Sequence, residues 1–303
     1  MWQALAAYAV RGPAQAALLS FSTLLLSLLL PPLAVISNAV IALVWLRLGP
    51  VKGATTVAIA LVAGTLVAGF SGNPFTPAAL MMSFWLPVIV MAYVLGRTVS
   101  LNLAILAGGG LALAGVLIVY IVLDQPSESW LSMVEKIVEA TKGETENDAN
   151  TQLFVEGLAD VGKWITGFSA ATQLVLAVLS LLLARVWQAR MFNPGGLQQE
   201  FHRLRFGLTA GVAGAIVLVA SVVLQMELLT NLAIVVIALF AFQGIAVLHA
   251  LVAQFKMHVI FLVAVYVCLV FLSPQSIIVI GLLGMADTWL DFRNRLSAPG
   301  GSN

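Results

Sequence analysis

The sequence has little charge, one cysteine and no cluster of basic residues. Only 9% of its 303 residues are charged, whereas roughly 25% is usual in a soluble domain. The one cysteine, Cys268, lies in an apolar run, which excludes an intrachain disulfide and a cluster of thiolate metal ligands. A nucleic-acid-binding surface needs clustered basic residues, and the net charge here is only +1. We therefore expect no nucleic-acid partner.

Known catalytic motifs are missing as well. The chain contains no G-x-S-x-G, no H-E-x-x-H and no Walker sequence. No nucleophile stands beside a base that would activate it. We therefore expect no enzyme, no catalytic residue, no metal site and no cofactor.

Apolar residues, in contrast, make up 61% of the chain. They form runs of about 17 to 25 residues, long enough to cross a hydrocarbon core of about 30 Å. The sequence predicts an all-α fold, a polytopic transmembrane bundle of about eight to ten spans, within a single integral membrane domain of residues 1–303. Ten spans fit best, at about residues 14–31, 33–48, 54–70, 77–96, 101–123, 165–188, 207–226, 229–252, 256–273 and 275–291.

Two junctions leave the number of spans open. Pro31-Pro32 joins the first two spans and Ser273-Pro274 joins the last two. Each pair is either a hairpin or a single helix kinked at proline. The first span also resembles a signal peptide, but no A-x-A-like cleavage site follows it, so we expect it to remain.

The basic residues predict the orientation of the spans, because lysine and arginine gather at cytoplasmic ends. With both termini in the cytoplasm, 11 of the 14 basic residues fall in cytoplasmic segments. They are Arg11, Arg47, Lys52, Arg97, Arg185, Arg190, Arg203, Arg205, Lys256, Arg293 and Arg295. The remaining three lie in the outer loop, and residues 292–303 form a short cytoplasmic tail.

That outer loop, residues 124–163, is the only long polar segment. Trp130, Leu131 and Val134 recur at helical spacing opposite Glu135 and Lys136, which predicts an amphipathic helix at the membrane interface. The acidic stretch after it, residues 143–152, is typical of a flexible turn. The loop is either a lid or docking element, or a solvated linker.

Charged residues near the membrane interior are the usual sign of a functional site. Asp287 and Asp291 lie four residues apart near the end of the last span, on one helical face, and Arg295 is four further on. Spacing allows an Asp291–Arg295 pair. Asp287 lies deeper and needs a partner or a proton; it either couples helix ends, accepts a proton or cation, or is simply interfacial. The arginines expected on the same side are Arg97, Arg203, Arg205 and Arg293.

A second candidate region is the stretch "NPGGLQQEFHRLR". Pro194 restricts Asn193 to an extended conformation, and Gly195 and Gly196 permit a tight turn. The following residues, which include Glu200, predict about two turns of amphipathic helix on the cytoplasmic surface. We expect an elbow here between two spans.

Small and amide-bearing residues are the third candidate set. A small-xxx-small ladder in the third span allows close helix packing, within the molecule or against a partner; it comprises Ala54, Ala58, Ala60, Gly64 and Ala68. Asn38, Asn73, Asn102 and Gln243 are expected to make interhelical hydrogen bonds or to line a cavity. His249 and His258 form either a relay or metal pair, or two separate interfacial residues.

The NPGG elbow, followed by "GLLGMADTWLDFRNRL" with its Asp-x-x-x-Asp-Phe-Arg ending, resembles the YybS-like bacterial membrane proteins, domain of unknown function 2232. The resemblance covers nearly the whole chain and implies a multi-pass protein of the bacterial inner membrane. That family is distantly similar to the S components of energy-coupling-factor transporters and to the rod-shape membrane protein of the Mre system. S components bind a vitamin or metal between about six helices and dock on a membrane subunit, for which the Ala54–Gly64 ladder would be the docking face.

Two functions are consistent with these features. The first is a substrate-binding, transport-type protein with a mostly neutral cavity for a small molecule of unknown identity. The second is a scaffold for envelope or cell-shape machinery that transports nothing. The lipid bilayer is a partner in both, and a membrane protein partner or a homo-oligomer is possible in both.

Overall fold

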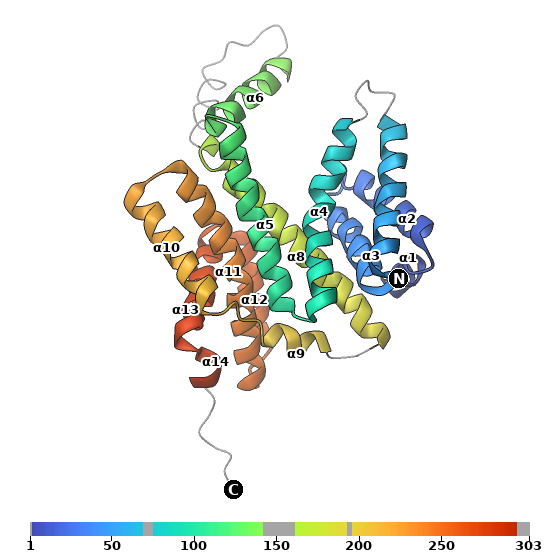
Figure 1. The fold of residues 1–303 in the computed structure, drawn as a ribbon. Coiled ribbons are helices and arrows are strands. Elements are labelled where there is room, and N and C mark those ends of the chain that lie inside the picture. Colours follow the sequence, from blue (N-terminus) through green and yellow to red (C-terminus); the bar gives the residue numbers. More distant parts are fainter. Residues whose placement is uncertain (1, 69–74, 142–160, 193–195, 296–303) are drawn as a thin grey trace.

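Every regular element of the protein, in the part of the chain that the structure describes, is an α-helix. The computed structural model describes residues 2–68, 75–141, 161–192 and 196–295 (Figure 1). The helices are α1 Trp2–Ala9, α2 Pro13–Leu26, α3 Leu33–Ala68, α4 Phe75–Thr98, α5 Leu101–Val122, α6 Pro126–Thr141, α8 Ile165–Phe192, α9 Gly196–His202, α10 Leu208–Leu224, α11 Glu227–Gln254, α12 Ile260–Phe271, α13 Gln275–Leu290 and α14 Phe292–Arg295. The predicted all-α class is confirmed.

Helix α3 contains two of the predicted spans. Gly49 inside it has φ 84° and ψ 172°, which breaks the helical backbone just before Pro50. Val35 and Val67 line the same cavity, although a straight helix would separate them by about 48 Å at 1.5 Å per residue. The two halves of α3 are therefore antiparallel neighbours, as the separate predicted spans 33–48 and 54–70 require. Glycine is needed at this turn because a residue with Cβ rarely adopts so positive a φ.

The apolar helices coincide with the predicted spans. Five of them are long and apolar enough to cross a membrane: α3, α4, α5, α8 and α11. Four shorter apolar helices, α2, α10, α12 and α13, match the other predicted spans. They have 12 to 17 residues, fewer than the about 20 that an upright helix needs. Turns separate α2 from α3 and α12 from α13, so both proline junctions are hairpins.

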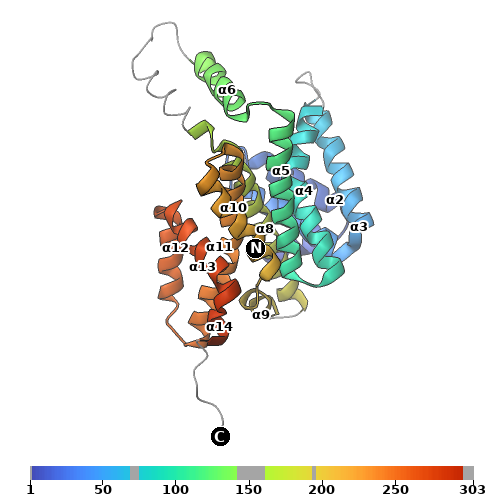
Figure 2. The same cartoon turned by 60° about the vertical axis from the view of Figure 1, so that its left-hand side comes forward.

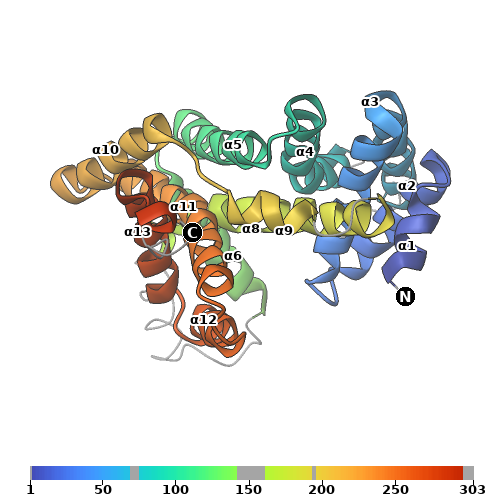
Figure 3. The same cartoon turned by 90° about the horizontal axis from the view of Figure 1, so that it is seen from below.

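Two helices hold the bundle together. Helix α8 runs obliquely through the molecule and contacts α3, α4, α5 and α11 (Figures 1 and 3). Helix α11 contacts α5, α8, α10 and α13, and α12 lies at the outside of this group (Figure 2). One group, α1–α4, and the other, α10–α13, thus lie on either side of α5 and α8.

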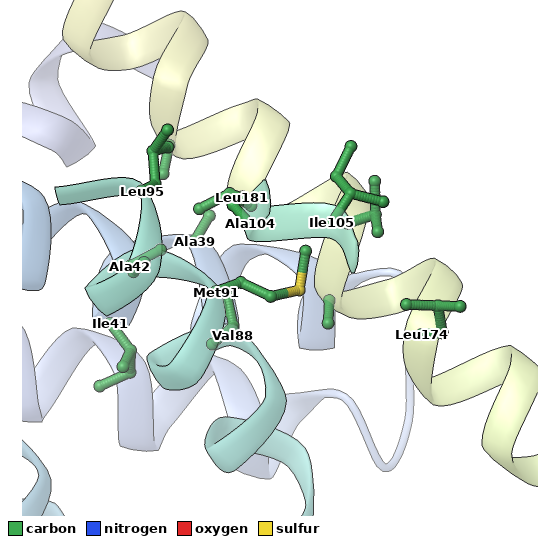
Figure 4. Packing of buried hydrophobic residues seen from close by; sticks show 14 of the residues in the cluster. Ala39, Ile41, Ala42, Val88, Met91, Leu95, Ala104, Ile105, Leu174 and Leu181 are labelled. Atoms are coloured by element: carbon green, nitrogen blue, oxygen red, sulfur yellow. The ribbon is translucent and has the colours of Figure 1, made fainter. Parts of the chain in front are cut away.

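Figure 4 shows part of the apolar core between α3, α4, α5 and α8. Ala39, Val88 and Met91 are fully buried there beside Ile105 and Leu181. Alanines alternate with larger side chains, which lets these helices approach closely. Helix α1, which precedes the first predicted span and was not predicted, packs on the same core through Ala6 and Ala9.

The two ends of the bundle differ in charge. The α4–α5 turn, α9, the α11–α12 turn and α14 lie at one end in Figure 1, and Arg97, Arg203, Lys256 and Arg295 lie in or beside them. We call this the basic end. Helix α6 projects from the opposite end and is bonded to α8 through Trp130 Nε1, which donates to Thr166 Oγ1 over 3.0 Å. The predicted amphipathic helix is confirmed, whereas the acidic stretch 143–152 lies outside the described residues.

Candidate functional site

Asp287, near the end of α13, is fully buried and paired. Arg293 Nη2 donates to its Oδ2 over 2.6 Å, and the backbone N–H of Phe292 donates to its Oδ1 over 3.1 Å. Gln243 Nε2 lies 3.4 Å from Oδ2. A buried carboxylate is tolerated when it is paired with a cation and hydrogen-bonded in this way.

The backbone after α13 brings this partner into place. Asp291 has a left-handed conformation, with φ 47° and ψ 57°, and ends the helix. The chain reverses there, and the short helix α14 carries Arg293 back to Asp287. Arg293 Nη1 also donates to the carbonyl oxygens of His202 and Leu204 over 2.8 and 3.1 Å. This one, mostly buried arginine therefore links the end of α13 to the segment between α9 and α10.

Arg205, in that same segment, makes a second connection. Its Nη2 donates to the carbonyl oxygen of Thr288 over 3.0 Å, and its Nη1 lies 3.3 Å from Asp291 Oδ2. A cation at the carbonyl end of a helix is electrostatically favourable. The spacing allowed an Asp291–Arg295 pair, but the Asp291 carboxylate pairs with Arg205 instead. The left-handed backbone at Asp291 ends α13, so Asp291 and Arg295 are not on one continuous α13 helix.

The buried amide of Gln243 and the partly buried amide of Asn102 complete this group. We call it the Asp287 cluster: Asp287, Asp291, Arg205, Arg293, Gln243 and Asn102. Gln243 Oε1 accepts from the backbone N–H of Phe206 over 2.9 Å, and its Nε2 donates to Thr288 Oγ1 over 3.3 Å. Asn102 Oδ1 accepts from the backbone N–H of Arg205 over 3.3 Å. The expected interhelical bond of Gln243 is confirmed, because it joins α11 to Thr288 of α13. Asn102 of α5 bonds the α9–α10 linker instead of another helix.

Other predicted site residues lie apart from this cluster. Glu200 on α9 pairs with Arg185 on α8, and the Arg97 guanidinium lies 5.5 Å from the centroid of the Tyr93 ring. Arg203 and Arg295 are exposed. Gly196 begins α9, which confirms a short helix after the elbow, while Asn193, Pro194 and Gly195 lie outside the described residues, as does Asn73.

The histidine that neighbours His249 is His202, not His258. The His202 and His249 rings are 6.4 Å apart between centroids, whereas His258 is exposed in the α11–α12 turn. Burial, with a smaller contribution from His249, lowers the pKa of His202 below its ordinary value of 6.5. In the part of the chain that the structure describes, no three His, Cys, Asp or Glu side chains lie close enough to hold a metal ion.

A cavity of about 830 Å³ lies near the end of the bundle opposite α9 and α14. We call it the outer cavity. Its walls come from α2, both halves of α3, α4 and α8, and include Phe21, Val35, Met81 and Phe84. Among the described residues that line the cavity, only Ser27 and Thr172 have polar side chains. These walls can therefore hold hydrocarbon, and none of the described lining residues offers a charge to a ligand.

The small-residue ladder of α3 divides into two faces. Ala60 and Gly64 are buried, and a Cβ at Gly64 would overlap with Met81, so this face packs within the molecule. Ala54 and Ala58 are exposed and line a smaller apolar groove of about 350 Å³ with Trp45 and Leu86. The side chain of Ala68, like all of residues 69–74, is not described.

Sequence reasoning missed two contacts that fix helix positions. Gly244 of α11 packs directly against the backbone of Gly284 of α13, where any Cβ would overlap. Asn231 at the other end of α11 is fully buried, and its side chain bonds Tyr120, Gly167 and Lys163. The sequence did contain signals for these contacts. They were the glycines in two different spans, Gly244 and Gly284, and the amide of Asn231 near the start of a span.

A profile of predicted membrane proteins, DUF2232, matches residues 17–288. The chain belongs to this family. The match covers most or all of each of the ten apolar segments, and it includes Asp287 but not Arg293. No curated protein and no solved structure matches the chain.

This DUF2232 protein is an integral membrane protein with two sites of different chemical character, the charged Asp287 cluster and the apolar outer cavity. The Asp287 cluster satisfies its own charges and ties four helices at the basic end. The outer cavity is apolar and opens between helices at the other end. The first can hold the bundle together, and the second can hold a ligand.

Proposed function

We propose that the protein resides in the bacterial cytoplasmic membrane and binds an apolar small molecule, such as the hydrocarbon chain of a lipid, in the outer cavity. The observation that carries the proposal is the cavity itself, about 830 Å³ with almost purely apolar walls. Ligand sites are usually concave, largely apolar and between about 300 and 1,000 Å³.

The lining restricts the class of ligand. The resemblance to S components implies a vitamin or a metal, which would need several polar or charged contacts. Ser27 and Thr172 offer only hydroxyl groups. An ionised group placed here would lose its hydration without gaining a partner. The proposal is therefore limited to an apolar chain and to binding; transport would be a further step.

A photoactivatable fatty acid tests this proposal on the purified protein. Leu80 lines the cavity and is 59% exposed, so Leu80→Trp fills space with little cost to folding. Leu18→Trp is the matched control, because Leu18 is 61% exposed and lines neither cavity. We expect Leu80→Trp to weaken probe binding about ten-fold, equivalent to roughly 1.4 kcal/mol, and Leu18→Trp to leave it unchanged. Equal labelling of all three proteins would contradict the proposal.

A membrane scaffold is the second candidate, supported by the exposed face of Ala54 and Ala58. Small residues on an exposed helix face permit close approach of another helix. Ala58→Leu would then remove a co-purifying membrane protein, while Ala213→Leu on the exposed face of α10 would not. If neither substitution changes what co-purifies, the scaffold function fails and the ligand-binding function is unaffected.

A further inference from the structure

Two Arg-x-Arg sequences that lie about ninety residues apart meet at the basic end. Arg293 Nη1 binds the carbonyl oxygens on either side of Arg203, those of His202 and Leu204. This contact places the segment of Arg203 and Arg205 beside that of Arg293 and Arg295. Four guanidinium groups thus share one region with two carboxylates, Asp287 and Asp291, which leaves an excess of two positive charges.

The four arginines differ in the contacts that their side chains make. Arg205 and Arg293 are held by the Asp287 cluster, where they bind carboxylates and helix-terminal carbonyl groups. Arg203 and Arg295 are exposed and make no ion pair or hydrogen bond with their side chains within the described residues. The excess charge is therefore carried by these two side chains, which remain able to bind an anion.

Exposed apolar side chains lie close in sequence to both Arg-x-Arg segments. Leu208 opens α10, three residues after Arg205, and is 60% exposed; Trp289, four residues before Arg293, is 43% exposed. The two helices touch here, because a Cβ at Gly211 would lie 3.4 Å from the Trp289 ring. Tryptophan and arginine side by side at a helix end are typical of the headgroup region.

We propose that Arg203 and Arg295 form a binding site for the phosphate of an anionic phospholipid, whose acyl chain lies over Leu208 and Trp289. Guanidinium groups bind phosphate oxygens through paired hydrogen bonds. A soluble anion would use the charge but not the apolar surface, whereas a phospholipid uses both. This site is independent of the outer cavity, which lies at the other end of the bundle.

The test measures the binding of phosphatidylglycerol to the purified protein in neutral detergent by native mass spectrometry. The double variant Arg203→Gln, Arg295→Gln removes the two unpaired charges and leaves the Asp287 cluster intact. The matched control is Arg97→Gln, Arg190→Gln, which removes the same charge from exposed positions at or near the same end. Phosphatidylcholine with the same acyl chains and inorganic phosphate are the two comparison ligands.

We expect the first variant to bind phosphatidylglycerol about 30-fold more weakly, from roughly 1 kcal/mol per arginine near an anionic lipid. The control should change this affinity less than about three-fold. Three results would overturn the proposal: equal losses in both variants, equal binding of phosphatidylcholine, or competition by inorganic phosphate at similar concentration. The last would identify a site for a soluble anion instead of a lipid.

Discussion

Asp287 is a charged side chain kept inside an apolar bundle by a partner six residues away. Its contact with Arg293 depends on the left-handed backbone at Asp291, which turns α14 back toward α13. Arg293 in turn holds the carbonyl groups before α10. The pair therefore does two things: it neutralises a buried charge, and it fixes the α9–α10 segment against α13.

Removing the carboxylate charge should be costly. We expect Asp287→Asn to lower the free energy of unfolding by about 3 kcal/mol, because Arg293 would keep a mostly buried charge without its partner. Asp291→Asn is the matched control, since its pair with Arg205 is partly exposed and should contribute less than about 1 kcal/mol. Denaturant titration of the purified protein measures both. Equal effects would show that Asp287 is merely interfacial.

His202 should make the stability of the folded protein depend on pH. Its pKa lies below 6.5 in the folded state, chiefly because burial disfavours the charged ring. The unfolded chain therefore takes up the proton first, so stability is full above pH 6.5 and falls as the pH decreases toward the folded pKa. We expect His202→Gln to flatten the change in the unfolding midpoint between pH 7.5 and 5.5. His258→Gln, at an exposed position, should not flatten it.

The sequence identified the residues of the Asp287 cluster but not their pairs. Asp287, Asp291, Arg205, Arg293, Gln243 and Asn102 could all be singled out as polar residues at span ends or inside apolar runs. Helical spacing predicted a partner for Asp291 within its own helix. The true partners lie across a helix end and on another element, and no local periodicity reports such contacts.

At the scale of elements, the packing of α11 on α13 depends on glycine. Gly244 and Gly284 meet where their backbones touch, and Gly281 lies against the Ile237 carbonyl oxygen, 2.7 Å from where a Cβ would be. Such contacts replace hydrophobicity as the source of association between helices in lipid. Replacing a helical glycine by alanine normally stabilises the helix by up to about 1 kcal/mol. A loss of stability on such a replacement at these positions would therefore be evidence of close helix packing.

We expect Gly284→Ala to destabilise the protein by about 1 to 3 kcal/mol, because its methyl group would overlap with the Phe240 carbonyl oxygen and push the helices apart. Gly110→Ala in α5 is the control, since nothing lies within 4 Å of a Cβ there. It should be neutral or slightly stabilising. If Gly284→Ala behaved like Gly110→Ala, the close packing of α11 and α13 would be wrong.

The elements themselves were largely predictable from apolar runs and breaks. Gly49-Pro50 divides α3 where two spans were expected, and Leu101–Val122 reproduces a predicted span almost residue for residue. Helix α1 was missed because its eight residues are too few for a span. Apolar length alone also could not show that α12 has only 12 helical residues.

At the scale of the whole molecule, the two ends carry different surfaces. Basic residues gather at the end that holds the Asp287 cluster, while the outer cavity and α6 lie toward the other (Figure 1). The distribution of arginine and lysine predicted this sidedness. The cavity could not be predicted, because its lining residues come from four helices and look like ordinary membrane-facing side chains in sequence.

The central claim is that the outer cavity holds an apolar chain. The most direct measurement is a cryo-electron microscopy reconstruction of the protein extracted with its native lipids. We predict elongated density between α2, α3, α4 and α8, in contact with Val35, Met81 and Phe84. A cavity closed by the side chains of these helices, or one that contains only ordered water, would contradict the claim.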